Sequence, residues 1–234
     1  MIQDFLGVVG GLGPMATAHF MKRIIEFTDA NTDQEHIKMM ILNATQIPDR
    51  TKFILGKSDE DPFDELLDCC KTLEAARAKL IAIPCNAAHY FYDKLAAEIS
   101  VPIVHMQRET VKELKSLNVR RIGIAATTGT ICAGLFQNAL KKVGLNYLVP
   151  DDEHQNKIMK VIYDDIKAGR ETAKKELLKS MDWFFESGCD RIVLGCTELS
   201  VLKSTFSLDA RFVDALDVTA KFVVRYFDKK IKEC

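Results

Sequence analysis

The feature of the sequence that most constrains the fold is an internal repeat. Three segments of the first half resemble three of the second half in the same order: residues 6–13 and 122–129, 80–86 and 191–197, 102–105 and 211–214. The spacings agree as well, since 78 residues separate Gly7 from Cys85 and 73 separate Gly123 from Cys196. We therefore expect two copies of one unit, each with a cysteine at an equivalent position.

Apolar runs alternate with helical patterns along the whole chain, which predicts an α/β protein. Such alternation is typical of mostly parallel sheets with helices on both faces. The division that we predict is one domain of residues 1–105 plus 212–234 and a second of residues 106–211. The predicted strands are Phe5–Gly10, Met39–Asn43, Leu80–Pro84, Ile103–His105, Ile122–Ala126, Arg191–Gly195 and Phe212–Asp214.

Three helices have clear boundary signals. One begins at Pro62 after the capping residue Asp61. A second has an apolar stripe from Leu177 to Phe185 and stops at Gly188. The last runs from Ala215 to about Lys232.

The composition narrows the class of protein. The chain has 234 residues, 47% of them hydrophobic, and its 32 basic and 33 acidic side chains give a net charge of −1. This balance argues against a basic nucleic-acid-binding protein and gives no sign of an anionic membrane partner. Seven cysteines without regular spacing indicate a reducing compartment rather than a disulfide framework. No secretory signal or long apolar run is present, so we expect a cytoplasmic protein.

Cys85 and Cys196 each follow a predicted strand, at the edge of the sheet where ligands bind in α/β proteins. If the two copies face each other, a substrate between them meets one sulfur on each side. Two opposed groups of one type suit racemisation, in which one thiolate removes a Cα proton and the opposite thiol returns one. The other five cysteines (Cys69, Cys70, Cys132, Cys189 and Cys234) are expected to be packing residues.

At these residues the sequence resembles the aspartate/glutamate racemase family, which is related to glutamate and hydantoin racemases. The resemblance covers nearly the whole chain and is carried by residues 7–17, 83–89 and 195–199. It implies a pseudosymmetric two-domain fold, a homodimer, and catalysis without pyridoxal phosphate or a metal. By the same resemblance Cys85 and Cys196 are the acid/base pair.

Several polar residues are candidates for binding an acidic amino acid. Asn86 and Thr197 directly follow the cysteines and could bind the α-carboxylate, and Thr127 matches a family position in the same pocket. Arg50 and Lys167 match the two cations that the family uses for the distal carboxylate.

One position departs from the family pattern. Ala87 stands where the family normally has threonine, so a hydroxyl that could donate to a carboxylate is missing. This affects the expected affinity or identity of the substrate more than the type of reaction.

Other interpretations stay open. His89 could polarise the site or serve only within its domain, and Glu198 could tune the second thiol or cap its helix. Gly11, Gly13 and Ala16 fit a loose dinucleotide fingerprint, but Pro14 removes a donor and no acidic residue follows the next strand. Cys85 and His89 alone make a weak zinc site. A broad-specificity racemase or related proton-transfer enzyme is the main alternative, ahead of a non-catalytic amino-acid-binding protein.

Overall fold

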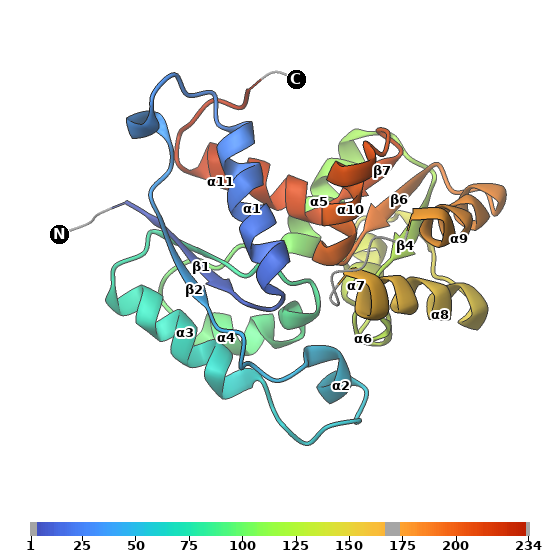
Figure 1. Cartoon of the computed structure of the whole chain (residues 1–234), viewed down its shortest axis with the longest axis horizontal. Coiled ribbons are helices and arrows are strands. Elements are labelled where there is room, and N and C mark those ends of the chain that lie inside the picture. The colour runs from blue at the N-terminus through green and yellow to red at the C-terminus, as the bar shows by residue number, and fades with distance from the viewer. Residues whose placement is uncertain (1–3, 167–173, 233–234) are drawn as a thin grey trace.

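The computed structural model describes residues 4–166 and 174–232 (Figure 1). Two parallel sheets form the framework, one of three strands in the order β2-β1-β3 and one of four strands in the order β5-β4-β6-β7. The strands are β1 (Leu6–Gly10), β2 (Met39–Asn43), β3 (Leu80–Ala82), β4 (Arg121–Ala125), β5 (Asn146–Leu148), β6 (Arg191–Leu194) and β7 (Phe212–Asp214). The predicted α/β class is confirmed.

The two sheets have the same topology, as the internal repeat predicts. In the first, Ile103 forms a parallel bridge to Ile81 of β3, and the Ile81 N–H donates to the Pro102 carbonyl at 2.9 Å. In the second, β7 pairs with β6, and the Ile192 N–H donates to the Arg211 carbonyl at 2.9 Å. The segment around Ile103 is therefore the counterpart of β7, although it makes a single bridge instead of a strand.

Helices cover both faces of the sheets. In Figure 1, α3 and α4 lie on one side of the first sheet, and α1 and α11 lie on the other. The α-helices are α1 (Pro14–Phe27), α2 (Arg50–Ile54), α3 (Phe63–Ala75), α4 (Tyr92–Glu98), α5 (Met106–Ser116), α6 (Thr128–Cys132), α7 (Leu135–Lys142), α8 (Asp152–Lys160), α9 (Lys174–Glu186), α10 (Thr197–Phe206) and α11 (Ala215–Tyr226). Two short 3₁₀ turns, η1 (Asp33–Glu35) and η2 (Ala87–Phe91), and a π-helical segment, η3 (Val161–Ile166), complete the described elements.

The helix boundaries follow local chemistry. The Asp61 carboxylate accepts the Phe63 N–H at 2.9 Å, so α3 begins one residue after Pro62. Gly188, with φ +81°, follows the end of α9 as predicted. The last helix ends at Tyr226, earlier than the predicted Lys232, because the chain turns at Asp228, whose φ is +54°.

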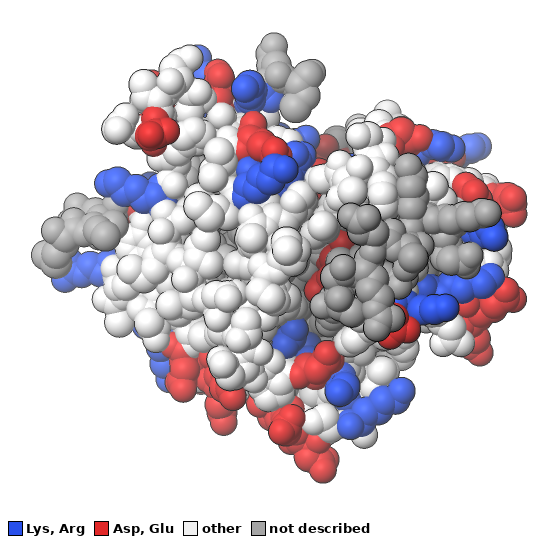
Figure 2. Space-filling view, in the orientation of Figure 1, with Lys and Arg blue, Asp and Glu red and all other residues white. Residues whose placement is uncertain are grey.

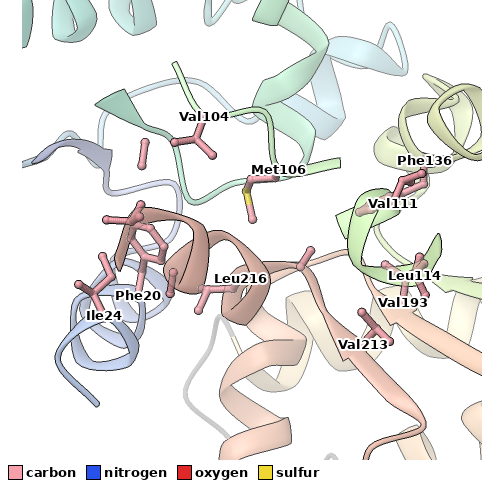
Figure 3. Close-up of a cluster of buried hydrophobic side chains, with 14 of the residues drawn as sticks. Phe20, Ile24, Val104, Met106, Val111, Leu114, Phe136, Val193, Val213 and Leu216 are labelled. Atoms are coloured by element: carbon pink, nitrogen blue, oxygen red, sulfur yellow. The ribbon is translucent and has the colours of Figure 1, made fainter. Parts of the chain in front are cut away.

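A hydrophobic cluster joins the two sheets. Figure 3 shows side chains of α1, α5, α11, β6 and β7 in this cluster, among them Phe20, Leu114, Leu216, Val193 and Val213. Because Leu216 of α11 lies between the two parts, the C-terminal helix packs against both.

The predicted boundary at residue 212 assigned β7 to the first domain, whereas β7 hydrogen bonds to β6 of the second sheet. The rest of the domain division stays a prediction.

The surface carries interspersed charges. Figure 2 shows basic and acidic side chains side by side around this face of the molecule, with no large region of one sign. In the described part of the chain, none of the helices has the length and apolar character needed to cross a membrane.

Candidate active site

Residues from both halves of the chain line a single pocket at the carboxyl ends of the parallel strands. Its cavity volume is about 20 Å³. The lining residues are Leu12, Asp49, Arg50, Thr51, Cys85, Asn86, Ala87, Thr127, Thr130, Tyr163, Gly195, Cys196, Thr197 and Glu198. The two cysteines of the repeat thus contribute to one site, as expected for sheets whose equivalent edges face each other.

Cys85 is buried in the turn that follows β3. The Cys85 N–H donates to the Ile83 carbonyl at 2.7 Å, and Pro84 has no N–H with which to extend the strand. This turn ends β3 at Ala82, two residues before the predicted end, and brings Cys85 to the pocket.

His89 supports the turn through the backbone and not through the thiol. Its Nδ1 lies 2.9 Å from the Cys85 carbonyl oxygen, and its Nε2 lies 3.1 Å from the Val104 carbonyl oxygen and 3.2 Å from the Met106 nitrogen. Burial lowers the pKa of His89, which favours the neutral ring. The interpretation of His89 as a residue bonded within its domain therefore agrees with its contacts.

Cys196 occupies the N-cap position of α10, and its thiol donates a hydrogen bond that has no counterpart at Cys85 in the described part of the chain. Its Sγ donates to Glu198 Oε2 at 2.9 Å, and the Thr197 hydroxyl donates to the same oxygen at 3.4 Å. Glu198 does not cap the helix, because no side chain accepts an N–H at this N-cap. Of the two interpretations of Glu198, interaction with the second thiol is the one that fits.

Asn86 presents a free amide nitrogen at the pocket. Its Oδ1 accepts a hydrogen bond from Gln107 Nε2 at 3.0 Å, and the Gln107 Nε2 also donates to the Asn86 carbonyl at 3.2 Å. The Asn86 Nδ2 is buried and has no partner among the described residues. Since buried donors are normally paired, this nitrogen is available to an acceptor that enters the pocket.

Arg50, at the start of α2, is buried and uses part of its guanidinium to hold three backbone carbonyls. Its Nη1 donates to Ile47 and Pro48 at 3.0 and 2.9 Å, and its Nη2 donates to Leu12 at 2.8 Å. The Nε is buried without a partner, and within the described residues no carboxylate forms an ion pair with Arg50. Arg50 therefore joins the loop after β1 to the start of α2 and keeps donors for an anion.

The remaining predicted site residues behave differently from one another. Thr127 caps α6 and lies 3.3 Å from Thr51 Oγ1, a contact between the two halves of the chain. Thr197, the counterpart of Asn86, and Ala87, the counterpart of Glu198, are both buried and line the pocket. Lys167 lies outside the described residues.

Several residues that line the pocket were not predicted from the sequence. Tyr163 donates its hydroxyl to the Asp49 carboxylate at 3.0 Å, which connects η3 to the residue that caps α2. The position of Asp49 directly before Arg50 was a signal for it. Tyr163, by contrast, comes from a segment with no motif, and only the fold brings it to the site.

The glycine-rich segment after β1 is explained by packing. Gly11 has a φ of +88°, and a Cβ atom there would lie 2.5 Å from the backbone of Ala44. Its N–H donates to the Thr17 hydroxyl at 2.9 Å. Gly11 thus allows the close approach of β1 and the end of β2, and it lines a second cavity beside the pocket.

A second cavity adjoins the pocket on the side of α1. The two share Leu12, Asp49, Arg50 and Glu198, and apolar side chains contribute further walls.

Within residues 4–166 and 174–232, no group of three or more His, Cys, Asp or Glu side chains is arranged to hold a metal ion.

Comparisons with known proteins agree with this geometry. Residues 9–223 match the family model described as Asp/Glu/Hydantoin racemase. Over 225 residues the chain is 24% identical to a broad-specificity amino-acid racemase, RacX, from Bacillus subtilis, covering 94% of this chain and 96% of that protein. It is 27% identical over 161 residues to a glutamate racemase from Aquifex aeolicus, covering 66% of this chain and 61% of that one.

Solved structures show the same fold. An aspartate racemase from Picrophilus torridus superposes with a TM-score of 0.87 and 24% identity, covering 98% of this chain and 96% of that one. An aspartate racemase homologue from Pyrococcus horikoshii superposes with a TM-score of 0.78 and 24% identity, covering 97% and 100%. The class of enzyme is indicated by the family model over residues 9–223, because racemases are isomerases.

Proposed function

Because the chain belongs to the Asp/Glu/Hydantoin racemase family, we propose that it interconverts L- and D-aspartate or glutamate by two-base proton transfer at Cα, without pyridoxal phosphate. The observation that carries this proposal is that Cys85 and Cys196, from equivalent positions of the two halves, line one pocket with Arg50 and Asn86. A thiol on each side is what an enzyme needs to treat both enantiomers alike.

In the proposed reaction the protons balance without a further reactant. One cysteine, as the thiolate, takes the Cα proton and becomes a thiol. The electrons of the broken Cα–H bond pass into the α-carboxylate of the substrate, which becomes an enediolate. The opposite cysteine then donates its thiol proton to the other face of Cα and becomes the thiolate. The reverse reaction exchanges the two roles, so each thiol acts as acid in one direction and as base in the other.

Charge on the substrate's carboxylates is met by donors of the pocket, of which the Asn86 Nδ2 and the Arg50 Nε have no partner among the described residues. The Asn86 Nδ2 and the hydroxyls of Thr127 and Thr197 are the candidates for the α-carboxylate, where negative charge increases in the transition state. The Arg50 Nε is the candidate for the distal carboxylate, and a guanidinium suits that group geometrically. These assignments favour a dicarboxylic amino acid.

The experiment that tests this function is isotope exchange in deuterium oxide. The metal-free, cofactor-free protein is incubated with each enantiomer of aspartate and of glutamate, and deuterium at Cα and optical rotation are followed over time. We expect racemisation to be accompanied by incorporation of solvent deuterium. Absence of exchange with every amino acid would contradict the proposal and leave a non-catalytic amino-acid-binding protein on the same fold.

A second candidate function is broad-specificity amino acid racemisation. It is favoured by the adjoining cavity, whose apolar walls include Leu12, Met15, Ile47 and Val201, and by the similarity to a broad-specificity racemase. Turnover of alanine, leucine and lysine beside aspartate would separate the two candidate functions, since an enzyme restricted to acidic substrates exchanges only aspartate and glutamate.

The homodimer and the cytoplasmic location stay predictions. The homodimer is testable by light scattering of the purified protein.

A further inference from the structure

Glu198 is a buried carboxylate with only one of its two oxygens in use. The residue is 5% exposed, and both donors that reach it, the Cys196 thiol and the Thr197 hydroxyl, share Oε2. The other oxygen, Oε1, is buried and has no partner among the described residues. In the same part of the chain, no lysine or arginine forms an ion pair with this carboxylate.

The Glu198 carboxylate lacks a hydrogen-bond donor or cation for its second oxygen among the described residues. Burial of a charge without a paired donor costs free energy, and buried anions in proteins normally have a cation or several hydrogen-bond donors. Glu198 lines both the cysteine pocket and the adjoining cavity, and its Oε1 lies 3.0 Å from the position that a Cβ atom on Gly13 would occupy. The free oxygen therefore lies at the boundary of the two cavities, where a substrate can reach it.

The unpartnered polar atoms of the pocket form a complementary set. Arg50 Nε and Asn86 Nδ2 are donors, and Glu198 Oε1 is an acceptor with negative charge. A dicarboxylic α-amino acid offers the opposite set, with two carboxylates to accept and one ammonium group to donate. The set has one acidic member because Ala87, at the position equivalent to Glu198, carries no polar group.

We propose, resting on the function given above, that Glu198 Oε1 binds the α-ammonium group of the substrate. The ligand class is then amino acids with a free, protonated α-amine. N-acylated amino acids, hydantoins and dicarboxylic acids without nitrogen leave the Glu198 charge buried and unpaired, so the pocket discriminates against them.

This contact also couples binding to the second thiol. The same carboxylate holds the ammonium through Oε1 and the Cys196 thiol through Oε2, so Cα, one bond from the nitrogen, is held on the side of Cys196. The ammonium neutralises the charge beside Sγ. Glu198 thereby orients Cα with respect to one of the two thiols and is a positioning residue for the proton transfer.

The test compares pairs of ligands that differ only in the amine. Binding of L-aspartate and succinate, and of L-glutamate and glutarate, is measured by calorimetry on the wild type, Glu198→Gln and Glu198→Asp. Gln keeps an acceptor for the Cys196 thiol but removes the charge. We expect the wild type to bind the amine-bearing member of each pair more tightly. Glu198→Gln should lower the affinity for aspartate and glutamate by about 10- to 100-fold and keep the affinity for succinate and glutarate.

Controls separate recognition of the amine from a structural role. Asp49→Asn changes the pocket's other carboxylate, which is bonded to Tyr163, and should leave the aspartate-to-succinate ratio near its wild-type value. Glu198→Asp keeps the charge and should restore part of the preference. Equal losses for aspartate and succinate in Glu198→Gln would overturn the proposal.

The proposal can fail independently of the proposed function. If the wild type racemises aspartate but binds succinate equally well, Glu198 does not recognise the amine and the racemase function stands, and this comparison needs no variant. If the wild type neither exchanges Cα protons nor binds amino acids, the function is wrong and this inference is wrong with it.

Discussion

The Cys196 thiol donates a hydrogen bond to Glu198 Oε2 at 2.9 Å, and the counterpart position beside Cys85 holds Ala87. The two cysteines of the repeat therefore lie in equivalent places but have different neighbours. Among the described residues, Cys85 Sγ has no hydrogen-bond acceptor for its proton. The two positions are equivalent in the repeat, and the pocket is asymmetric in its chemistry.

This difference predicts unequal reactivity of the two thiols. Alkylation requires the thiolate, and the Cys196 thiol donates its proton to a hydrogen bond with the Glu198 carboxylate. Iodoacetamide at neutral pH is therefore expected to modify Cys85 faster than Cys196, as followed by mass spectrometry of the two peptides. Glu198→Gln should raise the rate at Cys196 and leave Cys85 nearly unchanged. Faster modification of Cys196 in the wild type would contradict this prediction.

Arg50 is expected to contribute both to stability and to binding of the distal carboxylate. Arg50→Lys loses the planar fork that reaches the carbonyls of Leu12, Ile47 and Pro48. We expect a lower melting temperature and about a 10-fold or larger rise in KM for aspartate. Alanine, which has no distal carboxylate, is the control ligand, and its binding should change less. Equal effects on both ligands would indicate that Arg50 is structural only.

Ala87 offers a gain-of-function test. Its side chain lines the pocket and is buried, so Ala87→Thr adds a hydroxyl that can donate to a substrate carboxylate. We expect kcat/KM for aspartate or glutamate to rise by about 10-fold. Ala87→Val has nearly the same shape without the hydroxyl and should give no increase. An unchanged or lower kcat/KM in the threonine variant would count against a carboxylate at this position.

Asp214, at the end of β7, predicts a pH dependence of stability. Burial and, next, the Asp217 carboxylate raise the pKa of Asp214 to about 6, above the value of about 3.9 for an unfolded chain. The folded state thus binds a proton more tightly. The resulting stabilisation is present below about pH 4 and is lost as the pH rises through about 6.

Asp214→Asn removes this titration while its Oδ1 can still accept from Ser200 and from the Leu216 N–H. The quantity compared is the free energy of unfolding of the variant minus that of the wild type. This difference should be more favourable to the variant at about pH 7 than at about pH 4, by an amount on the order of 2 kcal/mol. Denaturant melts at the two pH values measure it. Asp93→Asn, at a side chain that is 95% exposed, is the control and should show no such change. A difference independent of pH at Asp214 would refute the prediction.

The sequence was informative about the fold wherever buried strands are apolar on both faces. Runs such as Leu6–Gly10 and Arg191–Leu194 are buried throughout or nearly so, and their positions were predicted to within a residue at each end. Strand β5 was missed because its three residues, Asn146–Leu148, form a half-exposed edge with no apolar run. The edge strand β2, which is also only partly buried, was predicted because Met39–Leu42 are four consecutive apolar residues.

For the site, the repeat predicted where the cysteines lie but not what surrounds them. The contacts of Arg50 with the Leu12 carbonyl and of Glu198 with the Cys196 thiol depend on side-chain orientation. Spacing alone left Glu198 with two interpretations, because a carboxylate in the first turn of a helix serves either as a cap or as a partner of the preceding residue. Only the packed structure distinguishes them.

The central claim, that Cys85 and Cys196 act on opposite faces of Cα, is tested most directly by exchange in the single variants Cys85→Ala and Cys196→Ala. Each variant is incubated in deuterium oxide with L- and with D-aspartate, and Cα exchange and racemisation are measured separately. We predict that neither variant racemises, and that any exchange that persists occurs with one enantiomer in one variant and with the opposite enantiomer in the other. Racemisation by either variant, or exchange of the same enantiomer by both, would contradict the two-base account.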